Sequence, residues 1–568
     1  MYLTSFTARR IKCFEEVTLH FPPSAEGSRA GWYVILGANA TGKTTLLQAI
    51  AVALVGASPS MRLVSPASWV RRDTNHGILE VEFLKGEDDK AEGAPRTGPY
   101  QAKLAVVGED PVELEGAEYT APQVTLLGNP KDKTYRGLQK GPYAANKRGW
   151  LVCGYGAFRR LTGGAENDLT YEPGRIGRVA SLFHESVALK RGLDWLPRLY
   201  ARSLEHSSDA AAMREEFEAA RRLLNQLLPA SVQIADVDTQ RVYFTAPGAS
   251  RVDLLDLSDG YRSFLALVMD LLRQIAETFG SVADRVRDLD GDELVVDAEG
   301  VVLIDEIDLH LHPTWQREIG PRLRRVFPQL QFVVTSHSPF IAQAASEGGL
   351  FVVRAASRDA PVQVIQPSSQ VSGWTVEQIL LSPLFGLTDT RDPETEALLR
   401  EHATLRGKTK FEHLDAEEQQ RLVSLERALA ERLTALTQCH EQMEMRKAAA
   451  ELRAIWVAGN EYLQNAAPWT ALKTDRDAAA VGVRTGLNAC ALFAILAQPF
   501  IPDAAKTVLD ALGVPEQNRS WPKADDRGVW DALPRGHKFA PPDVLFKKIE
   551  DEHVVEWNAR FGGGGPAQ

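Results

Sequence analysis

A glycine-rich segment near the amino terminus constrains the fold more than any other feature of this 568-residue sequence. The apolar run "WYVIL" leads into "GANATGKTT" (37–45), and an apolar, helix-forming stretch follows. This order of strand, loop and helix, with the pattern G-x-x-x-x-G-K-[ST], is the context that a P-loop requires. Because backbone N–H groups turn inward there and the helix adds the positive end of its dipole, the segment predicts phosphate binding.

The P-loop residues are expected to hold a nucleoside triphosphate with Mg²⁺. Lys43 is expected to contact the β- and γ-phosphates, and the hydroxyl of Thr44 is a candidate Mg²⁺ ligand. A chance glycine-rich turn is the alternative, which the strand–loop–helix setting disfavours. The predicted nucleotide-binding residues of the loop are Gly37, Ala38, Asn39, Ala40, Thr41, Gly42, Lys43, Thr44 and Thr45.

A second apolar strand, "VVLIDE" (301–306), ends in two acids. In P-loop enzymes an acid at this place holds the Mg²⁺ shell, and that role is assigned to Asp305. Glu306 follows it and is placed to polarise an attacking water as a general base. The alternative is a strand that ends in solvated acids, and the presence of the P-loop argues against it.

Strand-like and helical stretches alternate along the first two thirds of the chain, which predicts an α/β domain. The segment at about 85–150, rich in Gly, Pro, Lys and Asp, is expected to form hairpins and surface loops. Helical periodicity returns at about 180–228. The predicted divisions are an α/β domain at 1–395, a helical connector at 396–444, an all-α helical bundle at 445–560 and a flexible tail at 561–568.

Charge and composition exclude some classes of partner and some cellular locations. The formal net charge of −11 argues against general coating of nucleic acid, although it leaves room for a local basic groove. No apolar run is long enough to predict a membrane span, and the first residues lack the pattern of a signal peptide. The four cysteines are far apart and form no CxxC, so a reduced, cytoplasmic protein is expected.

Three further motifs give the first part of the chain a specific resemblance. "LSDGYRS" (257–263) is similar to the signature motif of ABC-type ATPases, and "DEIDLHLHP" (305–313) to their Walker B motif and D-loop. "TSHSP" (335–339) is similar to their switch segment. Together with the P-loop, the set resembles the SMC/RecF-like branch of ABC-type ATPases, and most closely the ATPases of prokaryotic defence systems such as Septu and PARIS.

The resemblance implies an ABC-type P-loop ATPase head that uses ATP and Mg²⁺. It further implies a head-to-tail homodimer with two ATP molecules between the protomers. Ser258 and Gly260 would contact the γ-phosphate held by the partner's Lys43. His337 would sense that phosphate as a catalytic residue beside Lys43 and Glu306, and Asp308 would cross the dimer interface.

The chain also departs from that family pattern. Ala40 stands where many relatives have Gly, and Asp259 and Tyr261 differ from the usual signature residues. No glutamine matches the lid glutamine of ABC-type ATPases. Between Thr44 and Leu257 no heptads are sustained, so a long SMC-type coiled-coil arm is not expected.

Several weaker patterns have structural alternatives. His310 and His312 form an H-x-H that could bind metal, but a packing or interface role is favoured because no third ligand is evident. "DLDGDE" (288–293) is interpreted as an acidic turn, since its glycine is at the fourth rather than the sixth position of a calcium loop. Arg159 and Arg160 in "CGYGAFRR" could meet phosphate or a partner, or form a solvated turn. No convincing nuclease constellation occurs in the sequence.

The carboxy-terminal part has an unrelated resemblance. "GNEYLQNAAPWTALK" (459–473) is followed in order by "AQPFIPDAA", "LDALGV", "RSW", "PRGHKF" and "VLFKKIE". The ordered set, over about a hundred residues, is similar to the anticodon-binding helical bundle of methionyl-tRNA synthetase. The alternative is a generic bundle in which Pro sets corners and Trp fills the core.

This second resemblance implies tRNA binding, with methionine tRNA as the first candidate. Trp521 occupies the place where an anticodon base stacks on a Trp in that family, a recognised way to bind unpaired RNA. The family's Asn and Arg readers on the first helix have no counterpart, so Arg519 and His537 are candidates to compensate. The catalytic signatures HIGH and KMSKS are absent, so aminoacylation is not expected.

Three functions follow as hypotheses. The leading one is an ATP-gated sensor or regulator of an anti-phage defence or stress-response system, with a tRNA-recognising tail and a separately encoded effector, a nuclease or toxin. The second is an SMC/RecF-like genome-maintenance ATPase that binds DNA and uses the helical bundle as an oligomerisation scaffold. The third is a translation factor that acts on tRNA directly.

Overall fold

The computed structural model divides the chain into unit 1, Met1–Thr388, and unit 2, Asp389–Gln568, which are described separately. The structure describes residues 1–24, 27–90, 99–144, 149–161, 174–289, 293–355, 362–367, 371, 373–387, 436–438, 441–442, 448–449, 451–453, 455–456, 476–522, 533 and 537–539. Within these residues no helix is both long and apolar enough to cross a lipid bilayer.

A six-stranded sheet lies at the centre of unit 1, in the order β18-β17-β3-β16-β15-β9. Neighbouring strands run parallel from β17 to β9, and β18 pairs antiparallel at one edge. Such strands are apolar nearly throughout because both faces of a parallel sheet are covered. The strands are β3 (Gly31–Gly37), β9 (Leu151–Tyr155), β15 (Gly300–Ile304), β16 (Leu330–Ser336), β17 (Leu350–Ala355) and β18 (Val362–Ile365).

The two faces of this sheet belong to two hydrophobic cores. Val34 and Leu36 of β3 pack in one core with residues of α7 (Asp259–Phe279) and α8 (Pro313–Val326). Tyr33 and Ile35 point to the other face, in a core shared with α1 (Lys43–Val55) and an antiparallel sheet. The alternation follows from the two-residue period of a strand, and it places α1 and α7 on opposite sides of the same sheet.

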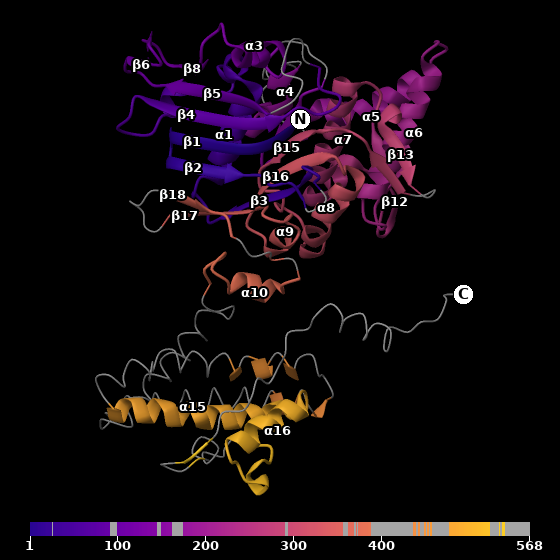
Figure 1. Ribbon diagram of the computed structural model, residues 1–568. Helices are drawn as coiled ribbons and strands as arrows, with labels where there is room; N and C mark the ends of the chain where they lie inside the picture. The colour runs from indigo at the N-terminus through magenta and orange to yellow at the C-terminus, as the bar shows by residue number, and fades with distance from the viewer. Residues whose placement is uncertain are drawn as a thin grey trace. The chain divides into compact units, whose positions relative to one another are not determined.

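A five-stranded antiparallel sheet, in the order β2-β1-β4-β5-β8, forms the indigo and purple side of unit 1 in Figure 1. The segment expected to be loop-rich supplies two strands of this sheet, β5 and β8, as well as the small hairpin β6–β7 and helix α3. The bounds are β1 (Tyr2–Ile11), β2 (Phe14–His20), β4 (His76–Leu84), β5 (Tyr100–Val107), β6 (Val112–Leu114), β7 (Ala117–Tyr119), β8 (Gln123–Leu126) and α3 (Lys133–Lys140).

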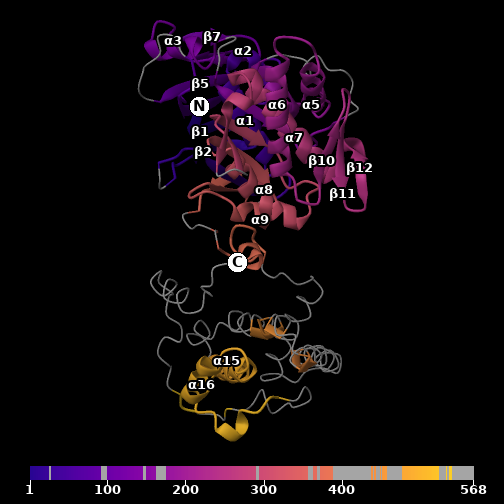
Figure 2. The same ribbon diagram turned by 90° about the vertical axis from the view of Figure 1, so that its right-hand side faces the viewer.

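Helices cover the other side of the central sheet, and those predicted at 180–228 are present. The antiparallel sheet β10-β11-β12 contacts α5 and α6, as Figure 2 shows, and β13 pairs with β14 as a hairpin. The remaining elements of unit 1 are α2 (Ala57–Ser60), α4 (Arg175–Phe183), α5 (Lys190–Ser203), α6 (Ala210–Leu227), α9 (Pro339–Gln343), α10 (Val376–Leu380), β10 (Gln233–Val237), β11 (Val242–Ala246), β12 (Ala249–Asp253), β13 (Val286–Leu289) and β14 (Glu293–Val296).

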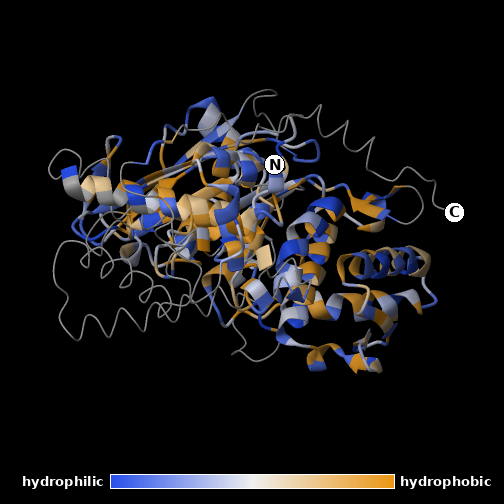
Figure 3. Cartoon of the chain, turned by 90° about the horizontal axis from the view of Figure 1, so that it is seen from below, coloured by the Kyte–Doolittle hydropathy of each residue, from blue (hydrophilic) through white to orange (hydrophobic). Residues whose placement is uncertain are grey.

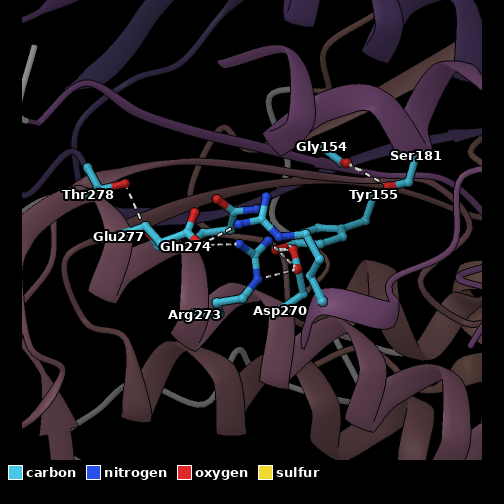
Figure 4. Close-up of polar contacts among 9 residues, drawn as sticks. Gly154, Tyr155, Ser181, Asp270, Arg273, Gln274, Glu277 and Thr278 are labelled. Carbon is cyan, nitrogen blue, oxygen red and sulfur yellow. Dashed lines mark hydrogen bonds and ion pairs between the residues drawn. The ribbon is translucent and has the colours of Figure 1, made fainter. Parts of the chain in front are cut away.

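A buried polar network joins α7 to strand β9 (Figure 4). The guanidinium of Arg273 donates to the Asp270 carboxylate at 2.6 and 3.1 Å and to Glu277 at 2.5 Å. The hydroxyl of Tyr155, at the end of β9, donates to the second Asp270 oxygen at 3.1 Å. Burial raises the pKa of the Tyr155 phenol well above its ordinary value, so this proton donor stays protonated. The network therefore fixes the second half of α7 against β9.

Unit 2 contains α15 (Arg476–Ala497) and α16 (Pro502–Ala511), followed by a short 3₁₀ turn at Glu516–Asn518. Pro502 is the first residue of α16, where the backbone N–H of any residue would have no acceptor within the helix, so the missing N–H of proline costs nothing. The helices in Figure 3 carry both hydrophobic and hydrophilic residues, as partly buried helices do. Leu492 and Leu496 of α15 and Leu509 of α16 contribute to two small hydrophobic cores, which also contain Leu436, Leu452 and Leu512 from other segments of unit 2.

The α/β fold with a P-loop and carboxy-terminal helices, predicted from the sequence, is confirmed. The segment 459–473, the connector apart from a few residues, and the tail at 561–568 lie outside the described residues. The division between the units falls at Thr388/Asp389, close to the predicted end of the α/β domain at 395.

Candidate functional site

Four neighbouring parallel strands end at the same edge of the central sheet, and a predicted or weighed residue follows or ends each of them. Gly37 ends β3, Asp305 follows β15, His337 follows β16, and Arg159 lies beyond β9. In open α/β sheets ligands bind outside the carboxyl ends of the strands. Segments that are distant in sequence are therefore brought together at this edge.

The P-loop backbone explains its glycines and one departure from the family pattern. Gly42 has φ 96°, and a Cβ there would lie 2.6 Å from the sulfur of Cys13. Ala40 has φ 62°, in the left-handed region that favours glycine. This conformation costs an alanine about 1–2 kcal/mol. Glycine would adopt this backbone without the cost, and Ala40 adopts it with some strain.

Lys43 is buried at the base of the loop. Its ammonium donates to the carbonyls of Gly37 and Ala38, each at 3.0 Å, and to Nε2 of His337 at 2.8 Å. Burial lowers the pKa of Lys43, and the nearby carboxylates of Glu306 and Asp305 oppose the shift. Because Nε2 of His337 accepts this hydrogen bond from the ammonium, the ring must be neutral, with its proton on Nδ1. Burial and the Lys43 ammonium lower the pKa of His337, in agreement with that state.

Asp305 accepts hydrogen bonds from two threonines. The Thr44 hydroxyl donates to Oδ2 at 2.8 Å, and the Thr335 hydroxyl donates to Oδ1 at 2.6 Å. The Thr335 oxygen also accepts the backbone N–H of Glu306 at 2.7 Å. A hydroxyl and a carboxylate side by side are the oxygen ligands that Mg²⁺ prefers, so Thr44 and Asp305 fit the predicted metal position.

Sequence reasoning missed Thr335 and left Arg159 open. Thr335 was part of the quoted segment "TSHSP", but its contact with Asp305 depends on β16 lying beside β15. Arg159 is buried with 5% of its surface exposed, whereas Arg160 is exposed. One guanidinium N–H of Arg159 donates to the backbone carbonyl of Glu306 at 2.9 Å. The interpretation of Arg159 as part of a solvated turn is therefore wrong.

The signature segment begins α7. Ser258 is the exposed N-cap residue and makes no capping bond with its side chain. Gly260 is buried, and a Cβ there would lie 2.5 Å from the carbonyl oxygen of His310. Glycine at this place therefore lets α7 approach the turn after β15. Among the described residues no hydrogen bond joins Ser258 or Gly260 to the P-loop of the same chain.

The H-x-H pair has a structural role for one of its members. Nδ1 of His312 accepts the backbone N–H of Thr314 at 3.3 Å, which caps the amino terminus of α8. His310 has φ 62°, and its carbonyl lies against the start of α7. No cluster of three or more His, Cys, Asp or Glu suited to a metal is found in the described ranges. The packing role favoured for this pair agrees with these contacts.

The three candidate tRNA contacts of unit 2 are engaged within the bundle. The indole N–H of Trp521 donates to the Thr437 hydroxyl at 3.1 Å, and the half-buried ring packs against the core that contains Leu436. Arg519 donates to the carbonyl of Val514 at 2.8 Å and pairs with Asp510. These contacts fix the orientation of Trp521 and Arg519 but do not test a nucleic-acid role.

His537 is likewise held by its own unit. Its Nε2 donates to the carbonyl of Leu512 at 2.6 Å, so that nitrogen carries the proton. Nδ1 can then accept a hydrogen bond when the ring is neutral, or donate one when it is charged. Its predicted RNA contact, like those of Trp521 and Arg519, stays a prediction.

Comparisons with known families identify three segments of the chain. Residues 6–96 match a family described as "AAA domain", and residues 168–342 match one described as "AAA domain, putative AbiEii toxin, Type IV TA system". Residues 414–565 match the family described as "Anticodon binding domain of methionyl tRNA ligase". The chain therefore contains segments similar to AAA domains and, further along, a segment similar to an anticodon-binding domain.

Relatives among curated proteins include methionine–tRNA ligases of several bacteria. That of Hyphomonas neptunium is 61% identical over 140 residues, which is 24% of this chain and 24% of the ligase. That of Maricaulis maris is 62% identical over 136 residues, with the same shares of the two chains. This chain therefore spans about a quarter of the length of the curated relatives it matches.

Among solved structures, an Smc head bound to the C-winged helix domain of ScpA is similar to 64% of this chain and 98% of that chain, with 14% sequence identity and a TM-score of 0.39. The SMC head domain from Thermotoga maritima has 13% identity and a TM-score of 0.33, over 65% of this chain and 100% of that chain.

Proposed function

We propose that this chain binds ATP and hydrolyses it, and that the reaction takes place at the carboxyl edge of the central sheet. The observation that carries the proposal is the contact set that brings Lys43 and Thr44 of the P-loop together with Asp305 and His337, which follow β15 and β16. Phosphoryl transfer depends mainly on positioning and charge stabilisation, and both are what these groups offer.

Each of these side chains has a proposed part in the reaction. Lys43 exchanges its carbonyl acceptors for phosphate oxygens and stabilises the negative charge that develops on the γ-phosphate. Glu306 accepts a proton from water as that water attacks the γ-phosphorus and the bond to ADP breaks. Neutral His337 accepts a hydrogen bond from Lys43, so a change in the contacts of Lys43 with the γ-phosphate also reaches His337.

The oxygen atoms of Thr44 and Asp305 would hold Mg²⁺. When bound, the ion neutralises charge on the β- and γ-phosphates. The Thr44 hydroxyl donates to Asp305 at 2.8 Å, so the two oxygen groups lie side by side where the ion would bind. Thr335 holds the other oxygen of Asp305 and thereby fixes the carboxylate plane.

The ATP site is proposed to be completed by a second copy of the chain. Ser258 is exposed at the amino terminus of a 21-residue helix, where the helix dipole favours an anion. Substitution of Gly260 by a larger residue would not test this proposal, because any Cβ there would clash with the His310 carbonyl of the same chain. Mixing Lys43→Ala chains with Ser258→Arg chains should restore hydrolysis, since mixed dimers contain one intact composite site. No recovery in demonstrated mixed dimers would contradict this arrangement.

The second unit is proposed to bind tRNA, with methionine tRNA as the first candidate. Two similarities support this proposal. The chain is 61% identical to a methionine–tRNA ligase over 140 residues, and residues 414–565 match the family described as the anticodon binding domain of methionyl tRNA ligase. The alternative, a helical scaffold that supports a DNA-binding ATPase, predicts no RNA preference. Sequencing of RNA that co-purifies with the full-length protein distinguishes the two, because enrichment of tRNA supports the first and its absence supports the scaffold.

We place the two activities in one regulator. The ATP state of unit 1 controls a separately encoded effector, and the tRNA on unit 2 is sensed or presented, in an anti-phage or stress-response system. The family description that names a toxin of a type IV system supports this direction for residues 168–342. A direct test measures ATP hydrolysis by wild type and by Lys43→Ala with and without methionine tRNA. Equal rates for the two proteins would remove the ATPase proposal.

A further inference from the structure

Arg159 is a buried cation beside the candidate ATP site that the roles proposed above do not use. Its side chain is removed from water, and a buried guanidinium needs compensation because the loss of hydration is expensive. Burial lowers the pKa of Arg159 to about 10, while the nearby carboxylates of Asp305, Asp308 and Glu306 oppose that shift. A desolvated positive charge is therefore maintained next to three acidic residues of the candidate site.

The guanidinium supports the backbone turn that starts at Glu306. One N–H of Arg159 donates to the Glu306 carbonyl at 2.9 Å, and the same carbonyl accepts the N–H of Leu309 at 3.1 Å. On the other side of the residue, the Glu306 N–H donates to the Thr335 hydroxyl at 2.7 Å. Both peptide groups that flank the Cα of Glu306 are thus held by side chains, one from β16 and one from the segment that follows β9.

The conformation of Glu306 explains why such support is needed. Its φ is 44°, in the left-handed region, which costs a non-glycine residue about 1–3 kcal/mol and persists only where the surroundings hold it. The φ of this residue sets the direction in which its side chain leaves the backbone. The contacts that stabilise this φ therefore also determine where the carboxylate lies.

Arg159 differs from a cation that serves only the core. Arg273 illustrates that case, because its guanidinium forms buried ion pairs with Asp270 at 2.6 Å and with Glu277 at 2.5 Å. In the part of the chain that the structure describes, Arg159 makes no ion pair and donates to a backbone carbonyl instead. Its Nε is buried and lacks a hydrogen-bond partner among those residues, as does Oδ1 of Asp308. Such unsatisfied atoms are uncommon among the buried polar groups of folded proteins.

We propose that Arg159 is a positioning residue for ATP hydrolysis, acting through the Glu306 carbonyl to fix the carboxylate of the general base. The inference rests on the proposed ATPase function and adds a residue to it. Arg159 makes no contact with the P-loop in the described structure, and the contacts of Lys43 do not involve it. Its loss should therefore slow turnover while ATP binding persists.

The test compares full-length Arg159→Met, Arg159→Lys and wild type. Methionine keeps the apolar stem and removes the donor and charge, whereas lysine retains one donor for the Glu306 carbonyl. Arg159→Met should lower kcat about 10- to 100-fold, the effect of displacing a reacting group by about 1 Å, with the ATP Kd within about twofold of wild type. Arg159→Lys should recover most of the lost kcat. The matched control is Arg160→Met, at the exposed neighbour, which should behave as wild type.

A second readout does not depend on hydrolysis. Amide hydrogen exchange at 306–311 should accelerate in Arg159→Met and remain as in wild type in Arg160→Met. An unchanged kcat, unchanged exchange, or a parallel loss of ATP binding and thermal stability would each overturn the positioning role. If wild type hydrolyses ATP no faster than Lys43→Ala, the proposed function itself fails. The exchange measurement then still decides whether Arg159 holds the turn.

Discussion

In unit 1 the candidate site residues come from separate strands and contact one another, whereas in unit 2 the candidate residues contact the bundle that carries them. Lys43 meets His337, and Thr44 meets Asp305, across about 260 to 290 positions of sequence. Arg519 and His537, by contrast, bind backbone carbonyls only five and 25 positions away. In unit 1 the candidate residues contact one another, whereas in unit 2 each of the three contacts other residues of the bundle, from five to 84 positions away.

This difference has a lesson for the use of sequence similarity. The helical unit matches methionine–tRNA ligases at 61% identity, but that figure describes a whole domain and does not identify which side chain meets RNA. In unit 1 a few short motifs carry the proposed chemistry. A single substitution in unit 1 should therefore have a larger effect on activity than a single substitution in unit 2.

The largest expected effect is that of Glu306→Gln. The amide cannot accept a proton from water, so hydrolysis should fall by about 100-fold or more, within the range that general-base catalysis supplies. ATP binding should persist because the contacts of Lys43 and Thr44 remain, and ATP should then accumulate in a dimer visible by light scattering. Recovery of tRNA with the protein serves as the control and should not change. Hydrolysis at the wild-type rate would show that Glu306 is not the base.

A smaller effect is expected from Trp521 in unit 2. Trp521→Leu keeps apolar packing against the Leu436 core but removes the aromatic face, which should weaken tRNA binding about 10- to 100-fold if a base stacks there. Trp521→Phe retains a ring and should lose less. ATP hydrolysis should be unaffected by either change. Equal tRNA affinity for Trp521→Leu and wild type would assign this residue to the core alone.

Thermal stability should respond modestly at Ala40. Because φ is 62° at this position, Ala40→Gly removes strain but adds disorder to the unfolded chain, and a net gain below about 1 kcal/mol is expected. Ala38→Gly is the matched control, since Ala38 is not among the residues with positive φ, and it should destabilise unit 1 slightly. Thermal unfolding of the two variants should therefore shift in opposite directions. A shift in the same direction would contradict the conformational argument.

The smallest expected effect is a pH dependence at His337. Its pKa lies below the ordinary value of 6.5 because of burial and the Lys43 ammonium, so the unfolded chain takes up a proton on acidification before the native chain does. Wild type should therefore lose stability relative to His337→Gln as the pH falls below about 6.5, and the two should run parallel above pH 7.5. Melting temperatures in a buffer series would measure this, with a difference of about 1 °C. A growing advantage of wild type at low pH would reverse the sign and reject the neutral state.

The parts of the candidate site that can be assigned from the sequence are contiguous in the chain. The P-loop with Lys43 and Thr44, and the acidic pair after β15, are assigned their proposed roles because their chemistry and their strand context are local. Thr335 and Arg159 were not assigned, since their roles depend on strand order, with β16 and β9 on either side of β15. No pattern in a single sequence specifies that order.

The fold shows the same limit. Strand β5 lies within a segment that its Gly, Pro and charged residues marked as loops, but its run "LAVV" is buried between β4 and β8. The overall composition of a long segment hides a short strand, and only pairing with neighbours reveals it. Gly260 is a similar case. A side chain is excluded there by the carbonyl of His310, which is distant in sequence.

The clamp between Arg273, Asp270 and Tyr155 has a mechanical consequence. The backbone carbonyl of Tyr155 accepts the N–H of Asp305 at 2.8 Å, so α7, β9 and the acidic end of β15 form a continuous linkage. A shift of α7 along β9 would therefore also strain the hydrogen bond that holds the backbone of Asp305.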